Sequence, residues 1–255
     1  MRTPLLALIA GALASVLFTG VAHAAPPAYS PVLTKNAIYK TGKLELKECA
    51  EQPVNGGDLD GARVYLVFLL DCLNDSWSQQ LAKKNIPFSK PGLEVIAKPG
   101  ARTACGRFPE GAQALYCPKN KKITFLLDQG ILAEPFELFL MEVLAHEYGH
   151  HVQQLTGMLK IVDRVKGKSK ARLYDESRRV ELQAECMSGA FIGSVWHSLG
   201  RRDFDFRYIV TTAQNGYDYA SHGKASNIAW WLKRGFDAES PNVCNTWAAS
   251  KSKVS

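Results

Sequence analysis

Two histidines and a glutamate near the middle of the chain have the types and spacing of a metal-dependent hydrolase site. Residues 146–150 read HEYGH, which fits the pattern H-E-x-x-H. Residues four apart lie about 40° apart around a helix axis and about 6 Å apart along it, so both imidazoles can point at one ion. Glu147 points about 100° further round the helix, beside such an ion, where it could take a proton from zinc-bound water. The segment predicts zinc held by His146 and His150, with Glu147 as the general base.

A catalytic zinc site needs a third protein ligand and an open position. Glu181 and Glu185 lie four apart in a segment whose neighbours form an apolar stripe, and carboxylates on such a helix are costly to bury without partners. A metal site would supply the partners: Glu181 on the zinc, and Glu185 accepting a hydrogen bond from the outward ring N–H of His146 or His150. The competing interpretation is that both glutamates pair with neighbouring arginines or lysines at the surface.

Three further histidines could serve as the third ligand, namely His151, His197 and His222. The residues after His150 do not continue the longer pattern H-E-x-x-H-x-x-G-x-x-H. His151 faces another way round the helix, so we expect it to be a packing or surface residue. Glu181 is therefore the preferred third ligand.

The hydrophobic pattern predicts the helices that position these residues. The H-E-x-x-H segment lies in a helix from Glu134-Pro135 to about Thr156, ended by Gly157. Glu181 and Glu185 lie in a second helix, from about Tyr174 to Leu199. Further helices are expected over Leu59–Ala82, as one helix or two short ones, and near Ile228–Leu232.

A short strand is predicted at Leu93–Ile96, and a hairpin at Ala114–Cys117 and Ile123–Leu127. We expect the second strand of the hairpin to present an edge to extended peptide substrates. Residues 160–172 contain six basic residues and one acid, and are predicted to be a solvated connecting loop or, as the lesser alternative, a surface that binds anions or the cell envelope.

The N-terminus has the three parts of a secretory signal peptide. Arg2 precedes an apolar run from Leu5 to Val21, and Ala22–Ala24 forms an A-x-A cleavage site. Cleavage after residue 24 would export the mature chain; the alternative is an uncleaved membrane anchor, for which the run is short.

The composition is that of a globular protein. The chain has 255 residues, and the 46% of them that are hydrophobic exclude wholesale disorder. The net charge of +7 is too moderate for a protein that coats nucleic acid.

Export would permit disulfides among the six cysteines, and no C-x-x-C pattern indicates a thiolate metal site. Cys105 and Cys117 flank a loop that leads into the hairpin, so a local bridge between them is plausible. Spacing does not choose the other pairs.

Residues 146–153 (HEYGHHVQ) and 181–186 (ELQAEC) together resemble the neutral zinc metallopeptidase family of bacterial exported and membrane-anchored proteins. The likeness extends over roughly Leu59 to Trp247, although Glu185 stands where the family usually has Asp. It implies a gluzincin-like His₂Glu ligand set with Glu181 on zinc, as in CAAX-processing zinc proteases. It also suggests a bridge between Cys186 and Cys244, which leaves Cys49 and Cys72 as a third pair.

His222 resembles a histidine found downstream in such enzymes, where it could donate a hydrogen bond to the oxyanion of a tetrahedral intermediate. The alternatives are that His222 caps the helix near Ile228, or that Tyr217 or Tyr219 serves as the donor.

The sequence thus predicts an α+β, zincin-like domain, mainly helical, with a small sheet beside the H-E-x-x-H helix. We expect a signal peptide (1–24), an N-terminal arm or linker (25–57) and a zinc metallopeptidase domain (58–255). The predicted function is that of an extracytoplasmic endopeptidase with one Zn²⁺ per chain, acting on peptides or proteins, with weak contact to an anionic envelope and no nucleic-acid partner. The alternatives are a non-catalytic zinc protein of the envelope or a basic envelope-binding module.

Overall fold

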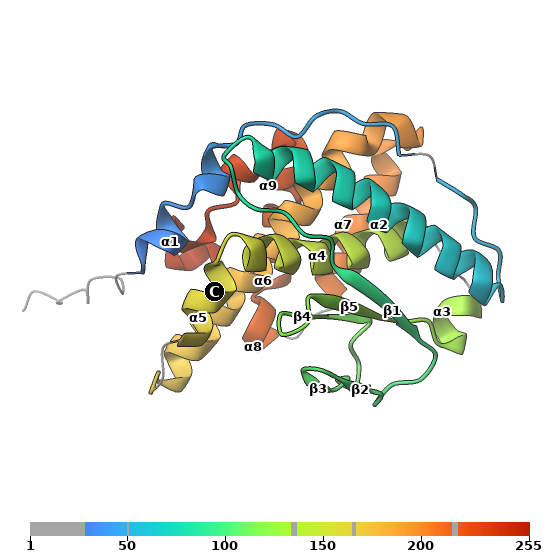
Figure 1. Ribbon diagram of the computed structural model, residues 1–255, viewed down its shortest axis with the longest axis horizontal. Helices are drawn as coiled ribbons and strands as arrows, with labels where there is room; N and C mark the ends of the chain where they lie inside the picture. The colour runs from blue at the N-terminus through green and yellow to red at the C-terminus, as the bar shows by residue number, and fades with distance from the viewer. Residues whose placement is uncertain (1–28, 50, 134–136, 165–166, 216–218) are drawn as a thin grey trace, which may run out of the picture.

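A computed structural model describes residues 29–49, 51–133, 137–164, 167–215 and 219–255 (Figure 1). The predicted signal peptide, the predicted helix start at Glu134-Pro135 and Tyr217 lie outside these residues. The described chain is mostly helical with a small sheet, which agrees with the expected α+β class. Its helices are α1 (Pro31–Thr34), α2 (Leu59–Ala82), α3 (Gln129–Ala133), α4 (Glu137–Leu155), α5 (Met158–Arg164), α6 (Lys170–Val195), α7 (Asp203–Asn215), α8 (Tyr219–His222) and α9 (Ala225–Ala238).

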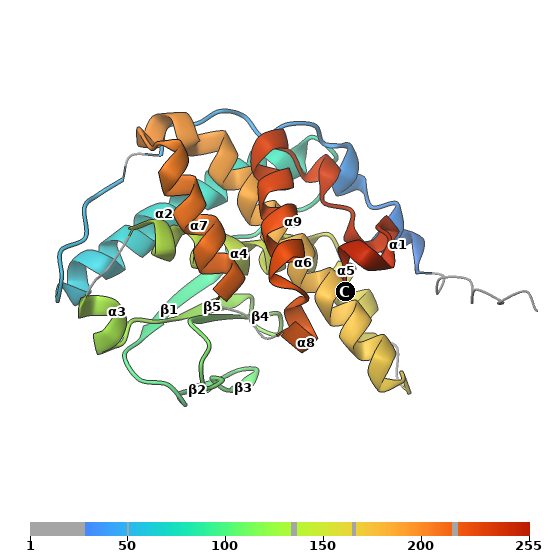
Figure 2. The ribbon, with the colours of Figure 1, turned by 180° about the vertical axis from the view of Figure 1, so that it is seen from behind.

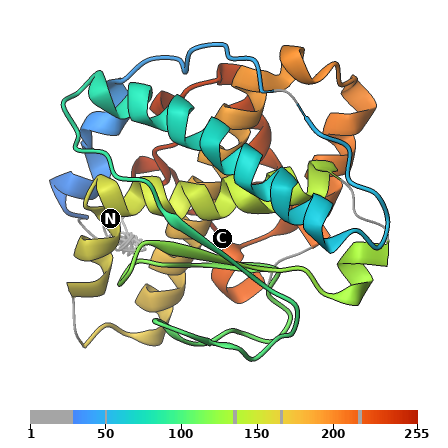
Figure 3. The ribbon, with the colours of Figure 1, turned by 45° about the vertical axis from the view of Figure 1, so that its right-hand side comes forward.

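The strands form a three-stranded sheet and a separate two-stranded ribbon. They are β1 (Gly92–Ile96), β2 (Arg102–Thr103), β3 (Gly106–Arg107), β4 (Ala114–Cys117) and β5 (Lys122–Leu126). In the main sheet the order is β1-β5-β4: β5 pairs in parallel with β1 and antiparallel with β4, as predicted for the hairpin. The expectation that the second hairpin strand forms the edge is wrong, because β1 occupies that side of β5. The edge strand that packs against α4 is β4. Figure 3 shows the sheet below the yellow-green α4.

Helix α4 lies at the centre of the molecule. The sheet lies on one side of it, and α6 with α7 and α9 lies on the other (Figure 2). Helix α2, whose bounds match the prediction, packs against α4 and buries residues such as Leu66, Leu73 and Trp77. The H-E-x-x-H motif thus lies on the helix that both layers contact.

Short-range signals explain where the helices begin and end. Asp58 caps α2 by accepting a hydrogen bond from the Gly61 N–H at 2.8 Å, and Ser169 caps α6. After α4, Gly157 takes a positive φ of 78°, a conformation that stops the helix as predicted. Helix α6 begins four residues earlier than Tyr174 and continues after Val195 as a 3-10 turn, Trp196–Leu199.

Residues 160–172 are not the connecting loop that their charge suggested. The α5 helix includes Lys160 and Arg164, and α6 begins at Lys170. Lys168 and Arg172 both pair with Glu176, a buried carboxylate on α6. Part of the positive charge is therefore neutralised within the fold.

The N-terminal segment packs onto the helices along much of its length. It contains α1 and a 3-10 turn, Ala37–Lys40, and it buries Leu33, Ile38 and Leu44 in the common core. The C-terminal segment adds three further 3-10 turns, at Pro241–Val243, Thr246–Ala248 and Lys251–Lys253. Both the N-terminal and the C-terminal segments of the described chain thus contact α6.

All six cysteines are paired in the structure. The pairs are Cys49–Cys72, Cys105–Cys117 and Cys186–Cys244, with Cα atoms 6.1, 5.6 and 5.5 Å apart. The three predicted pairings are confirmed. Among the described helices, none combines the length and apolar character that a membrane span requires.

Candidate zinc site

The site is formed where α4 and α6 cross at very close range. A Cβ atom added to Gly149 would lie 2.8 Å from both the Cα and the carbonyl oxygen of Ala184, closer than real Cβ atoms come. Gly149 separates the two histidines of the motif, and Ala184 separates Glu181 from Glu185. The absence of a side chain at residue 149 therefore lets the helix face that carries the two histidines meet the face that carries the two glutamates.

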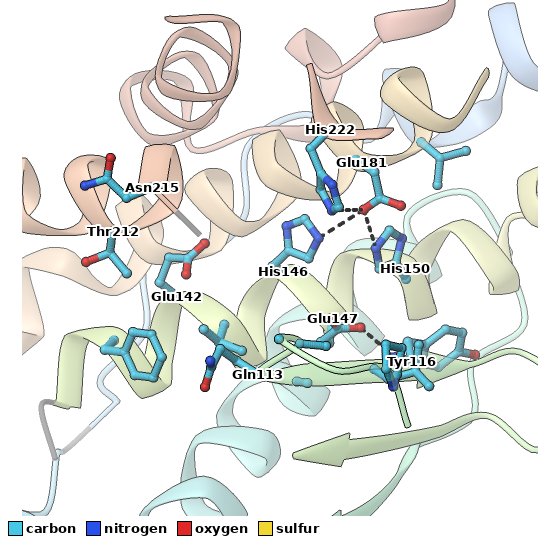
Figure 4. A pocket seen from close by; sticks show the side chains of 18 of the residues that line it. Gln113, Tyr116, Glu142, His146, Glu147, His150, Glu181, Thr212, Asn215 and His222 are labelled. Carbon is cyan, nitrogen blue, oxygen red and sulfur yellow. Dashed lines mark hydrogen bonds and ion pairs between the residues drawn. The ribbon is translucent and has the colours of Figure 1, made fainter. Parts of the chain in front are cut away.

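Three imidazole nitrogens surround one oxygen of Glu181 (Figure 4). Glu181 Oε2 lies 3.3 Å from His146 Nε2, 3.0 Å from His150 Nε2 and 3.4 Å from His222 Nε2. His146, Glu181 and His222 each place one ligand atom within 4.8 Å of the others. The structure thus brings the three predicted ligands together and adds His222 to them.

The outer nitrogens of the two motif histidines have partners of different charge. His146 Nδ1 lies 2.9 Å from Glu185 Oε2, the contact predicted for that glutamate. His150 Nδ1 lies 2.9 Å from Oε1 of Gln153, a neutral and fully buried amide that the sequence analysis did not identify. Each ring is therefore held at the nitrogen that faces away from Glu181.

The charges of the cluster stabilise one another. Burial by itself would raise the pKa of Glu181, but the imidazoles of His150, His146 and His222 outweigh it and hold that pKa well below its ordinary value. Burial would likewise lower the pKa of His146, but Glu181 and Glu185 raise it well above its ordinary value. The carboxylate of Glu181 and the imidazoles around it thus favour each other's charged forms.

Glu147 connects the helices to the sheet. Its Oε2 atom accepts a hydrogen bond of 2.6 Å from the backbone N–H of Tyr116 on β4. Burial raises the pKa of Glu147, and the neighbouring His150 and His146 oppose that rise without cancelling it. A carboxylate with a raised pKa is better suited to accept and return a proton than an ordinary one.

The remaining candidate residues, His151, His197 and Tyr219, differ in their surroundings. His151 is fully buried and is held by Tyr116 Oη at 3.0 Å and by the Ser89 carbonyl at 2.7 Å, and burial lowers its pKa to about 4. It is a packing residue, as expected. His197 is exposed in the 3-10 turn after α6, and Tyr219 is 59% exposed.

A cavity of ≈ 790 Å³ opens beside the cluster, and Glu147 lines it. Its wall includes Gln113 to Tyr116 of the sheet edge, and Phe139 and Val143 from the first turns of α4. Three further lining residues belong to no sequence motif that would predict them: Glu142, Thr212 and Asn215. Glu142 could have been found from its position one helical turn before His146.

The donor set fits zinc. Imidazole nitrogen and carboxylate oxygen are its usual ligands, and two histidines with one glutamate make a catalytic set. The outer-nitrogen partners are those that orient metal-binding histidines in proteins. His146, His150 and Glu181 are therefore the residues that would hold the ion.

Comparison with known proteins agrees with this chemistry. Residues 45–215 match the model of the family described as "Putative neutral zinc metallopeptidase", and the chain belongs to that family. The uncharacterized protein YpfJ of Escherichia coli K12 is 28% identical over 211 residues, covering 75% of this chain and 73% of its own. The uncharacterized protein Rv2575 of Mycobacterium tuberculosis is 26% identical over 205 residues, covering 63% and 66%. No solved structure matches the chain.

Proposed function

We propose that this protein is an extracytoplasmic zinc-dependent endopeptidase. The observation that carries the proposal is the meeting of His146, His150 and Glu181 at one point, with Glu147 beside them on a cavity. That cavity is within the range of ligand sites in proteins. The N-terminal sequence and the three disulfides support a location outside the cytoplasm.

The edge of the sheet supports a peptide as the substrate. By the alternation of an antiparallel strand, the N–H and C=O of Ala114 point away from β5, as the N–H of Tyr116 does. Ala114, Leu115 and Tyr116 line the cavity. An extended peptide could pair with this edge and so lie across the zinc ligands.

A zinc ion held by the two histidines and Glu181 would supply Lewis-acid polarisation of a peptide carbonyl and would acidify a water molecule. Glu147 accepts a proton from the attacking water and delivers it to the leaving amine nitrogen. The Tyr116 N–H fixes the orientation of that carboxylate. His222, 23% exposed at its side chain and at the edge of the cluster, donates a hydrogen bond to the developing oxyanion.

Peptide hydrolysis by the purified protein tests the proposal. A peptide library or casein should be cleaved by the zinc-loaded wild type and not by the Glu147→Gln variant, and both proteins should hold one zinc per chain. Wild-type protein that binds zinc but cleaves none of these substrates would contradict the proposal.

A second candidate is a non-catalytic zinc protein, and the position of His222 is the observation that favours it. His222 Nε2 lies 3.4 Å from the same Glu181 oxygen as the other two imidazoles, so it could complete a four-ligand structural site. The open cavity beside Glu147 favours the enzyme. Zinc retention in a His222→Ala variant separates the two, because a structural site would lose a ligand.

A further inference from the structure

A chain of buried amides connects His150 to the backbone of two distant segments. Gln153 Oε1 lies 2.9 Å from His150 Nδ1, and Gln153 Nε2 donates to the Val180 carbonyl at 2.8 Å and to Gln183 Oε1 at 3.0 Å. Gln183 Nε2 in turn donates to the Cys244 carbonyl at 3.0 Å. The side chains of Gln153 and Gln183 thus connect the histidine–glutamate cluster to the C-terminal segment.

The direction of every hydrogen bond in this chain is fixed by the two carbonyls. A carbonyl oxygen only accepts, so the amide NH₂ groups of Gln153 and Gln183 must face Val180 and Cys244. The oxygen of Gln153 must then face His150. An amide oxygen also only accepts, so Nδ1 of His150 must carry the ring proton.

The consequence appears at the other side of the ring. A neutral imidazole with its proton on Nδ1 has its lone pair on Nε2, the atom that lies 3.0 Å from Glu181 Oε2. This is the form that can bind a metal ion from the cluster side. The proton position at His150 is thus set by backbone geometry more than 25 residues away in the sequence.

Burial makes it costly to break any hydrogen bond of the Gln153 and Gln183 amides. Gln153 and Gln183 are both fully buried, so water cannot replace a lost partner. A buried amide left without its partner costs about 1–3 kcal/mol, which opposes rotation of either amide. Gln183 also donates to Tyr39 Oη at 2.7 Å, which ties the N-terminal segment to the same chain.

We propose that Gln153 is a positioning residue that fixes His150 in the tautomer with its proton on Nδ1, and that Gln183 and the Cys244 carbonyl hold Gln153 in place. The inference rests on the proposed zinc site but not on peptidase activity. It assigns His150 a neutral partner, in contrast to the carboxylate behind His146.

Proton-detected NMR of the zinc-loaded protein with ¹⁵N-labelled histidine tests the inference directly. The wild type should show a His150 ring proton on Nδ1 that exchanges slowly with solvent. Gln153→Met, which has a similar shape but no acceptor, should lose that protected signal, and its zinc affinity should fall about 10–100-fold. Gln153→Glu keeps an oxygen for Nδ1 and should keep the signal, although it melts at a lower temperature because the donor to Val180 is lost.

Tyr39→Phe is the matched control. It removes the hydroxyl that accepts a hydrogen bond from Gln183 but leaves the Val180 and Cys244 carbonyls in place, so the His150 signal and the zinc affinity should not change. A wild-type spectrum with the His150 proton on Nε2 would overturn the inference even if Gln153→Met did not fold. An unchanged signal and affinity in folded Gln153→Met would overturn it too. Zinc-loaded protein without peptidase activity would count against the proposed function alone, whereas wild type that binds no zinc would overturn both.

Discussion

The cavity has two walls of different construction. On one side, α4 and α6 form a helical wall, where His146, His150 and Glu181 converge and Glu185 and Gln153 hold the histidines from behind. Elsewhere in the lining, β4 and α8 contribute what we call the outer wall, which offers backbone groups of a sheet edge and the partly exposed His222; α8 itself packs against α6.

The difference separates two tasks. In the helical wall, both ring nitrogens of His146 and of His150 have polar partners, which suits residues that hold an ion in a fixed geometry. The outer wall has an open strand edge, which suits contact with a substrate that must enter and leave. Substitutions in the helical wall should therefore change zinc binding or stability, and those in the outer wall should change turnover with zinc retained.

Glu147 links the two walls, and its loss should have the largest effect on turnover. Glu147→Gln removes the group that accepts the proton but no metal ligand, so turnover should fall by about 10²–10⁴-fold. Zinc content by elemental analysis should stay at the wild-type level. A variant that retained substantial turnover would show that Glu147 is not the base.

His222 tests the outer wall. His222→Ala should reduce kcat by about 10²–10³-fold, the usual effect of removing one oxyanion donor, while zinc stays bound. Kinetics and zinc content should be measured on the same sample. Loss of zinc instead would make His222 a metal ligand and would contradict the division of tasks between the two walls.

Glu185 tests how strongly the helical wall depends on partners behind the ligands. Glu185→Ala removes the acceptor 2.9 Å from His146 Nδ1 and should weaken zinc binding by about 10–100-fold. Glu185→Gln keeps an oxygen without the charge and should have a smaller effect, and Glu185→Asp should be tolerated. Zinc affinity and rate unchanged in Glu185→Ala would refute this role.

Gly149 tests the close crossing itself. In Gly149→Ala the new methyl group meets the Ala184 backbone at 2.8 Å, so the helices must separate and the free energy of unfolding should fall by about 1–3 kcal/mol. Denaturant unfolding measures the loss. Gly130→Ala in α3 is the control, because its nearest atom, Asp128 Oδ1, is 3.4 Å away. Equal stability of the two variants would show that the crossing tolerates a side chain.

The smallest effect is expected at Asp175, on α6 but away from the cavity. Burial by itself would raise the pKa of Asp175, but hydrogen bonds from Tyr29 and Arg179 outweigh it and lower the pKa. A carboxyl with a lowered pKa stabilises the fold above its unfolded-state pKa, and this contribution is lost as the pH falls through its folded-state value. Asp175→Asn should thus cost at most about 1 kcal/mol at neutral pH.

The pH dependence of melting checks this prediction. The difference in melting temperature between Asp175→Asn and wild type should shrink as the pH is lowered below about 4. Asp237→Asn, which breaks an exposed ion pair with Lys233, is the control for a general effect of lost charge. A difference in melting temperature between Asp175→Asn and wild type that did not change with pH would contradict the lowered pKa of Asp175.

Local patterns predicted most elements around the site. The bounds of α2, the β4–β5 hairpin and the end of α4 at Gly157 were all readable, because each depends on neighbours within a few residues. The α7 helix was not predicted. Its buried stripe consists only of Asp205, Ile209 and Ala213, which is too narrow and too polar to stand out from a surface segment.

The sequence by itself determined which side chains can share a metal ion: spacing by four puts His146 with His150, and Glu181 with Glu185, on common helix faces. Only the tertiary structure decided how those faces meet. The contact of Gly149 with Ala184, the path from Gln153 through Gln183 to Cys244, the position of His222 and the choice of β4 as the edge all join elements that are distant in the chain. Helical periodicity fixes geometry within one element, whereas contacts between elements depend on how the whole core packs.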